Sequence, residues 1–181
     1  TGTHNTSVGK SSSRSNTTGI RNTAVGFFAY ASGTSGGSNT AIGYAALDAN
    51  TTASSNTAVG ASALTANTTG EFNVGIGSFA LAAATTADKN VAVGPVLFRS
   101  GRHALGANTT GTPNTSLGHH AKAAGTVGDQ ITAIGAFALG ENCTGNNNTA
   151  LGRAAGFEVT SGTNNLLLGQ DAGRSDSPSG K

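Results

Sequence analysis

One five-residue phrase recurs along this chain and constrains its fold more than any other feature. The phrase is Asn-Thr-Ala-Val-Gly, first intact at residues 22–26. Close copies end at ten glycines, here called the anchor glycines: Gly9, Gly26, Gly43, Gly60, Gly77, Gly94, Gly118, Gly135, Gly152 and Gly169. They are 17 residues apart at every step except the one from residue 94 to 118, which spans 24. Repetition at a fixed short period indicates units that stack on one another, so we predict a single repeat domain over residues 1–181.

The columns around the anchor predict a strand. The residue just before the anchor is aliphatic in every copy, and the residue three before it is Thr in seven of ten. These two positions share one strand face, and β-branched residues suit a buried strand, so we expect this face to point into the core. We expect the third residue after the anchor, usually Ala, to lie in the core as well. Asn stands four before the anchor in nine of ten copies, Ile131 being the exception, which predicts a ladder of stacked amides.

The predicted fold class is all-β: a parallel β-solenoid (β-roll or β-helix) of ten 17-residue coils. Gly, Asn and Thr at this density exclude a helix. The glycines do not recur at every third residue as collagen requires, and only 10% of residues are charged, fewer than a disordered chain usually carries. We expect two short extended segments and two turns in each coil. Coils about 4.8 Å apart would build a rod of roughly 48 Å.

Two positions directly after the anchor vary from coil to coil, which indicates an exposed or partner-facing edge. The longer step contains a seven-residue insertion, Pro95 to Gly101, which we predict to be a surface loop. From the loop and the variable positions we select six candidate partner-contact residues: Phe98, Arg99, Arg102, His103, His119 and His120.

The candidate chemical groups do not assemble into an enzyme. Glu71 and Asp88 occupy one column in successive coils, as do Glu141 and Glu158, at a separation also found between the carboxylates of retaining glycosidases. No Arg, His or aromatic cluster recurs around either pair, so we interpret them as solvated turn residues and predict no catalytic residue and no cofactor.

Metal, nucleic-acid and membrane binding are likewise not expected. The column shared by His103 and His120 favours surface histidines over a metal site. The single cysteine, Cys143, replaces a Thr of the repeat and is interpreted as a small buried residue. The net charge is +2 and there is no basic run, so we predict no nucleic-acid partner. The apolar runs are too short for a membrane helix, so we predict no membrane insertion.

The thin core predicted for one chain favours self-association. Each coil buries about one aliphatic residue, one Ala and sometimes a Leu, which is little against the entropy of ordering 17 residues. We predict a homo-oligomer, most simply a trimer of parallel solenoids, with end-to-end stacking into a filament as the alternative. A further alternative is an ice-binding protein that uses stacked Thr columns. Against it, adjacent turn threonines such as Thr17 and Thr18 point to opposite faces.

The phrases at residues 39–43 and 56–63 resemble the head repeats of YadA-like trimeric autotransporter adhesins, and they are similar to repeat regions of phage tail-fibre proteins. The resemblance covers essentially the whole chain, although the adhesin repeat is shorter. It implies a trimeric left-handed parallel β-roll with a structural or adhesive role in an extracellular fibre, on a cell surface or a virion. The implied partners are further copies of the chain and a cell-surface glycan or protein receptor.

Overall fold

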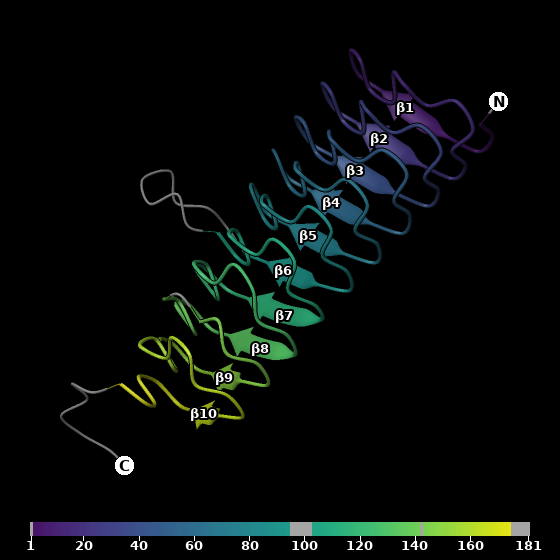
Figure 1. Cartoon of the computed structure of the whole chain (residues 1–181). Coiled ribbons are helices and arrows are strands. Elements are labelled where there is room, and N and C mark those ends of the chain that lie inside the picture. The colour runs from purple at the N-terminus through teal and green to yellow at the C-terminus, as the bar shows by residue number, and fades with distance from the viewer. Residues whose placement is uncertain (1, 95–102, 142, 175–181) are drawn as a thin grey trace.

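A computed structural model describes residues 2–94, 103–141 and 143–174, and it is a β-solenoid (Figure 1). Ten short strands pair in parallel in the order β1 to β10, so each coil adds one strand to a single sheet. The prediction of an all-β parallel solenoid is confirmed. The strands are β1 (Thr6–Val8), β2 (Thr23–Val25), β3 (Thr40–Ile42), β4 (Thr57–Val59), β5 (Val74–Ile76), β6 (Val91–Val93), β7 (Asn114–Leu117), β8 (Ile131–Ile134), β9 (Thr149–Leu151) and β10 (Leu166–Leu168).

The strand register follows the repeat. Ala24 pairs with Ala41 in the next coil, and each column of the sequence becomes a column of the sheet. The register also holds across the longer step, where Val93 of β6 pairs with Leu117 of β7. The seven extra residues therefore do not disturb the sheet, as the insertion hypothesis requires. Their loop, residues 95–101, lies outside the described residues.

The strand face that points into the core is the opposite of the one we predicted. The middle residue of the strand is buried, as at Ala24, Ala41 and Ala58, which are 0% exposed. The aliphatic residue before the anchor and the Thr two before that residue point outward, and Ile42 is 39% exposed. The alternation of faces was predicted correctly, but the assignment of the inner face was wrong.

The narrow interior of the coil explains this inversion. At Gly75, the middle residue of β5, an added Cβ would lie 3.2 Å from the carbonyl oxygen of Ala80 and 3.4 Å from Cγ of Leu64. The space between the strand and the opposite wall therefore admits a methyl group and little more. The opposite wall comprises the Ala three residues after the anchor, as predicted, and the Leu that follows it; both are buried at Ala63 and Leu64.

Each coil has one strand among the described residues, not the two extended segments we expected. The return leg is a series of turns, but it still bonds to the next coil. The N–H of Thr34 donates to the carbonyl of Thr51 (2.8 Å), and the Thr34 hydroxyl donates to the same oxygen (3.0 Å). Hydrogen bonds between coils thus continue where regular strand geometry is lost.

The predicted asparagine ladder is confirmed, with one refinement. Asn39 Oδ1 accepts from the backbone N–H of Asn56 (3.0 Å), and Asn56 Oδ1 accepts from that of Asn73 (2.9 Å). Most of these amides also donate to the turn of their own coil, as Asn56 Nδ2 does to the carbonyl of Gly70 (2.8 Å). The ladder mainly joins side chain to backbone, so its buried asparagines satisfy backbone groups of the neighbouring coil.

The anchor glycines are required by conformation and by space. Gly43 has φ +134°, which side-chain-bearing residues rarely adopt. A Cβ there would lie 2.6 Å from the backbone of Gly60 in the next coil. The corner therefore needs Gly in each stacked coil.

A buried asparagine closes the turn in several coils, seven residues after the anchor. Asn50 Oδ1 accepts from the N–H of Ala53 (3.0 Å), and its Nδ2 donates to the carbonyl of Ala53 (3.3 Å). Three residues earlier stands the buried Leu47. The same Leu-and-Asn pair recurs at Leu64 with Asn67 and at Leu105 with Asn108.

In two coils a long polar side chain and a glycine replace both members of this pair. Tyr30 stands in the leucine position and Gly33 in the asparagine position, and Tyr30 Oη donates to the carbonyl of Gly36 (3.0 Å), equivalent to the Ala53 carbonyl. A Cβ on Gly33 would lie 2.2 Å from the Tyr30 ring. A later coil combines Lys122 with Gly125, where a Cβ would lie 3.1 Å from Nζ. A long polar side chain and a glycine thus substitute for Leu and Asn.

Candidate functional surfaces

The outward side of the sheet is the most extensive candidate surface, and we call it the strand face. It consists of the first and third side chains of each three-residue strand and their equivalents in β7 and β8. Eight of its aliphatic side chains are between 37% and 68% exposed: Val8, Ile42, Ile76, Val91, Leu117, Leu151, Leu166 and Leu168. None of the ten strands places a charged residue there. The result is an uncharged stripe of Thr and aliphatic side chains along the rod.

The stripe is regular in two directions. Along a strand the two columns are two residues apart, roughly 7 Å, and neighbouring coils are about 4.8 Å apart. The unbroken register from β1 to β10 keeps each column straight, as the stacked strands in Figure 1 illustrate. Any partner that this face binds must therefore be flat and extended.

The turn threonines are a weaker candidate surface. Those of the column Thr17, Thr34, Thr51, Thr68 and Thr109 donate their hydroxyls to a carbonyl of the next coil, at 3.0 to 3.3 Å. These hydroxyls belong to the internal hydrogen bonding of the rod. In a later coil Thr144, and not Cys143, makes the equivalent bond, to Thr160. Cys143 is buried, as predicted.

The variable positions after the anchor carry aromatic rings that stack between neighbouring coils. The rings of Phe27 and Tyr44 are parallel, with centroids 5.7 Å apart. Two cations lie over rings of the same group: Lys10 over Phe27 and Arg14 over Phe28. Neighbouring coils therefore contact each other through these rings as well as through the backbone.

The three described histidines among the candidate residues also stack within the chain. His120 is buried (5% exposed), so the prediction of a surface histidine was wrong at this position. His103 stacks on Phe79 (centroids 5.0 Å apart), and burial lowers the pKa of His103. His119 and His120 stack on each other (3.9 Å), and both pack edge-on against Phe137. Phe98, Arg99 and Arg102 lie outside the described residues.

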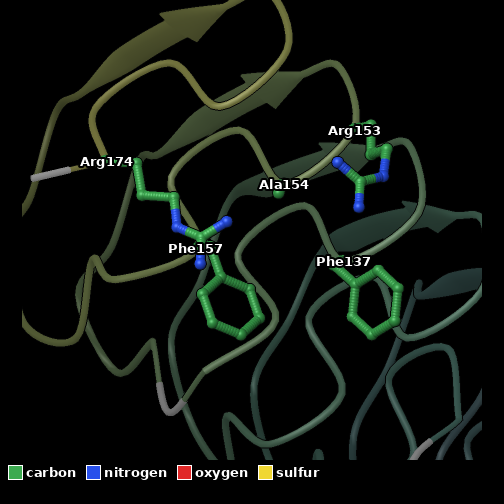
Figure 2. A pocket seen from close by; sticks show the side chains of 5 residues that line it. All are labelled: Phe137, Arg153, Ala154, Phe157 and Arg174. Atoms are coloured by element: carbon green, nitrogen blue, oxygen red, sulfur yellow. The ribbon is translucent and has the colours of Figure 1, made fainter. Parts of the chain in front are cut away.

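A small hollow lies among the last coils (Figure 2). Its volume is about 170 Å³, below the ~300 Å³ at which pockets for drug-sized ligands begin, so it suits a single sugar ring or one side chain. Phe157 and Arg174 stand on one side in Figure 2, and Phe137 and Arg153 on the other. The lining residues are Phe137, Arg153, Ala154, Phe157 and Arg174.

The charges around this hollow are balanced. Arg174 lies over the Phe157 ring and contacts Glu158 (3.6 Å) and Asp171 (3.3 Å). Arg153 is 4.0 Å from Asp171, and its side chain is 61% exposed. Hydrogen bonding from Gln170, together with Arg174 and Arg153, lowers the pKa of Asp171. Arg153 is therefore the cation with the most freedom to reach a ligand.

The carboxylate pairs have structural roles. Asp88 Oδ1 accepts from the N–H of Glu71 at 2.7 Å, so this pair caps a turn between coils. Glu158 of the second pair contacts Arg174. Within the described ranges, no three His, Cys, Asp or Glu residues lie close enough to hold a metal ion, and no helix is long and apolar enough to cross a membrane.

Column reasoning identified part of this surface. Phe137 and Arg153 occupy the variable positions after the anchor that the sequence indicated, although they were not selected as candidates. Phe157 and Arg174 were missed, because they lie five residues after consecutive anchors, in a column that otherwise holds mostly small residues. A Phe in one coil and an Arg at the same position of the next coil are the pattern that indicates the hollow.

No protein-family profile matches this chain, and no curated protein or solved structure is significantly similar to it.

Proposed function

We propose that this chain is a rigid structural and adhesive segment of an extracellular fibre, assembled as a parallel homotrimer through the strand face. The observation that carries the proposal is the exposure of aliphatic side chains along the outer side of an all-parallel sheet. All-parallel sheets are normally covered on both sides. The coil interior covers one side here, and further copies of the chain would cover the other.

The size of the strand face is consistent with this assembly. Ten strands at ~4.8 Å and a width of roughly 11 Å give a strip of about 500 Å². Two such strips bury about 1,000 Å² in total, near the lower limit for a specific interface. Three chains around one axis would add contacts from the positions beside each strip. The absence of charge on the strand face favours its burial.

Charge placed on the strand face tests the assembly. The variant Ile42→Lys/Ile76→Lys alters two residues that are each 39% exposed. The matched control Thr52→Lys/Thr69→Lys adds the same charge at exposed turn positions of the same region. We expect sedimentation equilibrium to give a trimer for the wild type and the control, and a monomer for the strand-face variant. A monomeric wild-type protein, or a strand-face variant that remains trimeric, would contradict the proposal.

The adhesive part of the function is assigned to the variable edge and its hollow. Arg153 and the rings of Phe137 and Phe157 combine exposed hydrogen-bond donors with apolar surface, a combination suited to a glycan or a protein side chain. We expect Arg153→Ala/Phe157→Ala to reduce binding to receptor-bearing cells without changing the oligomeric state. Equal binding by the variant and the wild type would assign adhesion to another surface.

A second candidate function is ice binding through the same strand face. A specific observation favours it: the outward Thr and aliphatic residues are separated by one residue and form a flat, straight array. The turn columns lack this arrangement. Ice binding needs the face free, whereas trimer assembly buries it. Thermal hysteresis from a monomeric protein would support ice binding, and a threefold particle in electron micrographs would support the fibre. End-to-end filaments would favour the self-assembling alternative.

A further inference from the structure

The region 116–131 interrupts the repeat inside the rod. Ser116 replaces the buried strand alanine, Lys122 the buried leucine, and Gly125 the turn asparagine. Ile131 replaces the ladder asparagine. Four interior positions thus change within about one coil, and at the ladder position all the other coils have Asn.

The apolar core divides at the same place. One cluster of buried apolar residues extends from Ala24 to Leu105, and a second begins at Ala121. Between them lies Ser116, whose hydroxyl donates to the carbonyl of Ala121 (2.7 Å). The rod therefore consists of two apolar blocks with a polar section between them.

The asparagine ladder is also interrupted there. Asn114 Oδ1 accepts from the N–H of Ile131 (3.0 Å), as in every regular coil. Ile131 has no side-chain amide and cannot continue the ladder to Asn148. One of the side-chain links between successive coils is therefore missing at this point.

Lys122 is the central residue of the irregular section. It is 0% exposed, and its Nζ donates to the carbonyls of Val127 (3.0 Å) and Gly125 (3.4 Å) and to Asn108 Oδ1 (3.5 Å). No carboxylate forms a salt bridge with it in the part of the chain that the structure describes. A buried ammonium group held only by neutral acceptors is costly to maintain.

We propose that the section around Lys122 is a joint in the rod, which opens more readily when the Lys122 amine is protonated. The joint would let the two apolar blocks move relative to each other as pH falls, while each block stays intact. This property is independent of the fibre function and holds for one chain.

The sign of the pH effect follows from the environment of the amine. Burial lowers the pKa of Lys122 from 10.5 to about 8, against the opposing influences of Cys143 and Asp129. The stability contributed by the neutral amine is present above pH 10.5 and is lost as pH falls from 10.5 through 8. Cys143 acts oppositely, because burial raises its pKa and stability falls as pH rises above 9.0.

Other titratable groups lie near the joint. Asp129 Oδ1 accepts from the N–H of Thr112 (2.8 Å), and His119 and the buried His120 stack on each other in the same coil as Lys122. The variant Lys122→Met keeps all of these groups and removes only the buried amine. A difference between wild type and variant therefore isolates Lys122.

Amide hydrogen exchange measured by mass spectrometry at pH 7 and pH 9, corrected for intrinsic rates, tests the proposal. The diagnostic amides are those of Leu105 and Lys122, which bond to the carbonyls of Ala121 and Ala138. We expect the opening constant at these amides to fall roughly ten-fold from pH 7 to pH 9 in the wild type. The peptide over residues 46–64, inside the first block, serves as the reference and should not change.

Lys122→Met should show no such change and stronger protection at pH 7. Equal opening of the joint and the reference peptide in the wild type would overturn the proposal, and so would an unchanged pH dependence in Lys122→Met. If Lys122→Met fails to fold, the comparison between the joint amides and the reference peptide in the wild type tests the proposal by itself. Lys122→Arg then adds a check: its permanent charge should leave the joint open at both pH values.

Discussion

The paired replacement of Leu and Asn by Tyr30 and Gly33 can be reversed, and the outcome is quantitative. In the double variant Tyr30→Leu/Gly33→Asn this coil receives the arrangement that Leu47 and Asn50 form. Both leucine-position residues have the same backbone conformation, with φ 52° at Tyr30 and at Leu47, so the exchange needs no change of the chain path. We expect the double variant to be nearly as stable as the wild type, while each single variant is destabilised.

The loss of unfolding free energy expected for each single variant follows from the contacts that it changes. Tyr30→Leu loses the hydrogen bond to Gly36 (3.0 Å), but Asn22 Nδ2 still donates to the same carbonyl (2.8 Å). The variant also loses the bond that Asn39 Nδ2 donates to Tyr30 Oη (3.3 Å), although Asn39 keeps its bond to the Ala53 carbonyl. The expected cost of these two bonds and a partly filled cavity is about 2 to 3 kcal/mol. Gly33→Asn alone places a Cβ 2.2 Å from the tyrosine ring. Such overpacking costs about 3 kcal/mol.

Urea denaturation followed by circular dichroism measures this cycle at one fixed protein concentration. The two single costs sum to about 5 kcal/mol, and we expect the double variant to lose less than about 1.5 kcal/mol, so the favourable coupling is at least about 3 kcal/mol. As a control, Tyr30→Leu combined with Asn67→Gly, two coils away, should be additive within about 0.5 kcal/mol. Additivity in the Tyr30 and Gly33 pair itself would refute the compensation argument.

Three further predictions concern the interior. Asn56→Ala should cost about 2 to 4 kcal/mol, because it leaves the Asn73 N–H and the Gly70 carbonyl without this partner. Thr52→Ala, at an exposed position, should cost less than about 0.5 kcal/mol in the same denaturation assay. Ala58→Val should lower the unfolding free energy by about 1 to 3 kcal/mol through overpacking, whereas the outward Val59→Ala should cost less; equal costs would contradict the inward assignment of the middle residue. Between pH 7 and pH 10.5 the unfolding free energy of the wild type should rise by about 3 kcal/mol relative to Lys122→Met, a difference that parallel denaturation series would detect.

The period alone was sufficient to predict the stacking, the register and the asparagine ladder. In a parallel solenoid each residue lies beside its equivalent one coil away. A residue type that recurs in a column must therefore pack or hydrogen-bond well against the same residue type in the next coil. Asn satisfies this condition because its amide both donates and accepts, and the bond from Asn73 N–H to Asn56 Oδ1 is the result. The small Ala column after the anchor was predicted for the same reason.

The tertiary structure decided which strand face is buried. Alternation states that Thr57 and Val59 share one face and Ala58 occupies the other, but it does not say which face is inside. The width of the coil makes that choice, and the width is set by Leu64 and Ala80 on the opposite wall. The β-branched residues we placed in the core therefore form the outer stripe.

Local conformations and contacts between coils also required the structure. Phe28, Tyr30 and Leu47 adopt positive φ although none is a residue type associated with it, so composition carried no indication of these corners. The hollow near Arg153 and the environment of Lys122 depend on which side chains meet from different coils. The sequence by itself determined that the chain stacks; the stacked coils then determined what faces in, what faces out and where the rod is weakest, because those properties depend on the space between the walls of a coil.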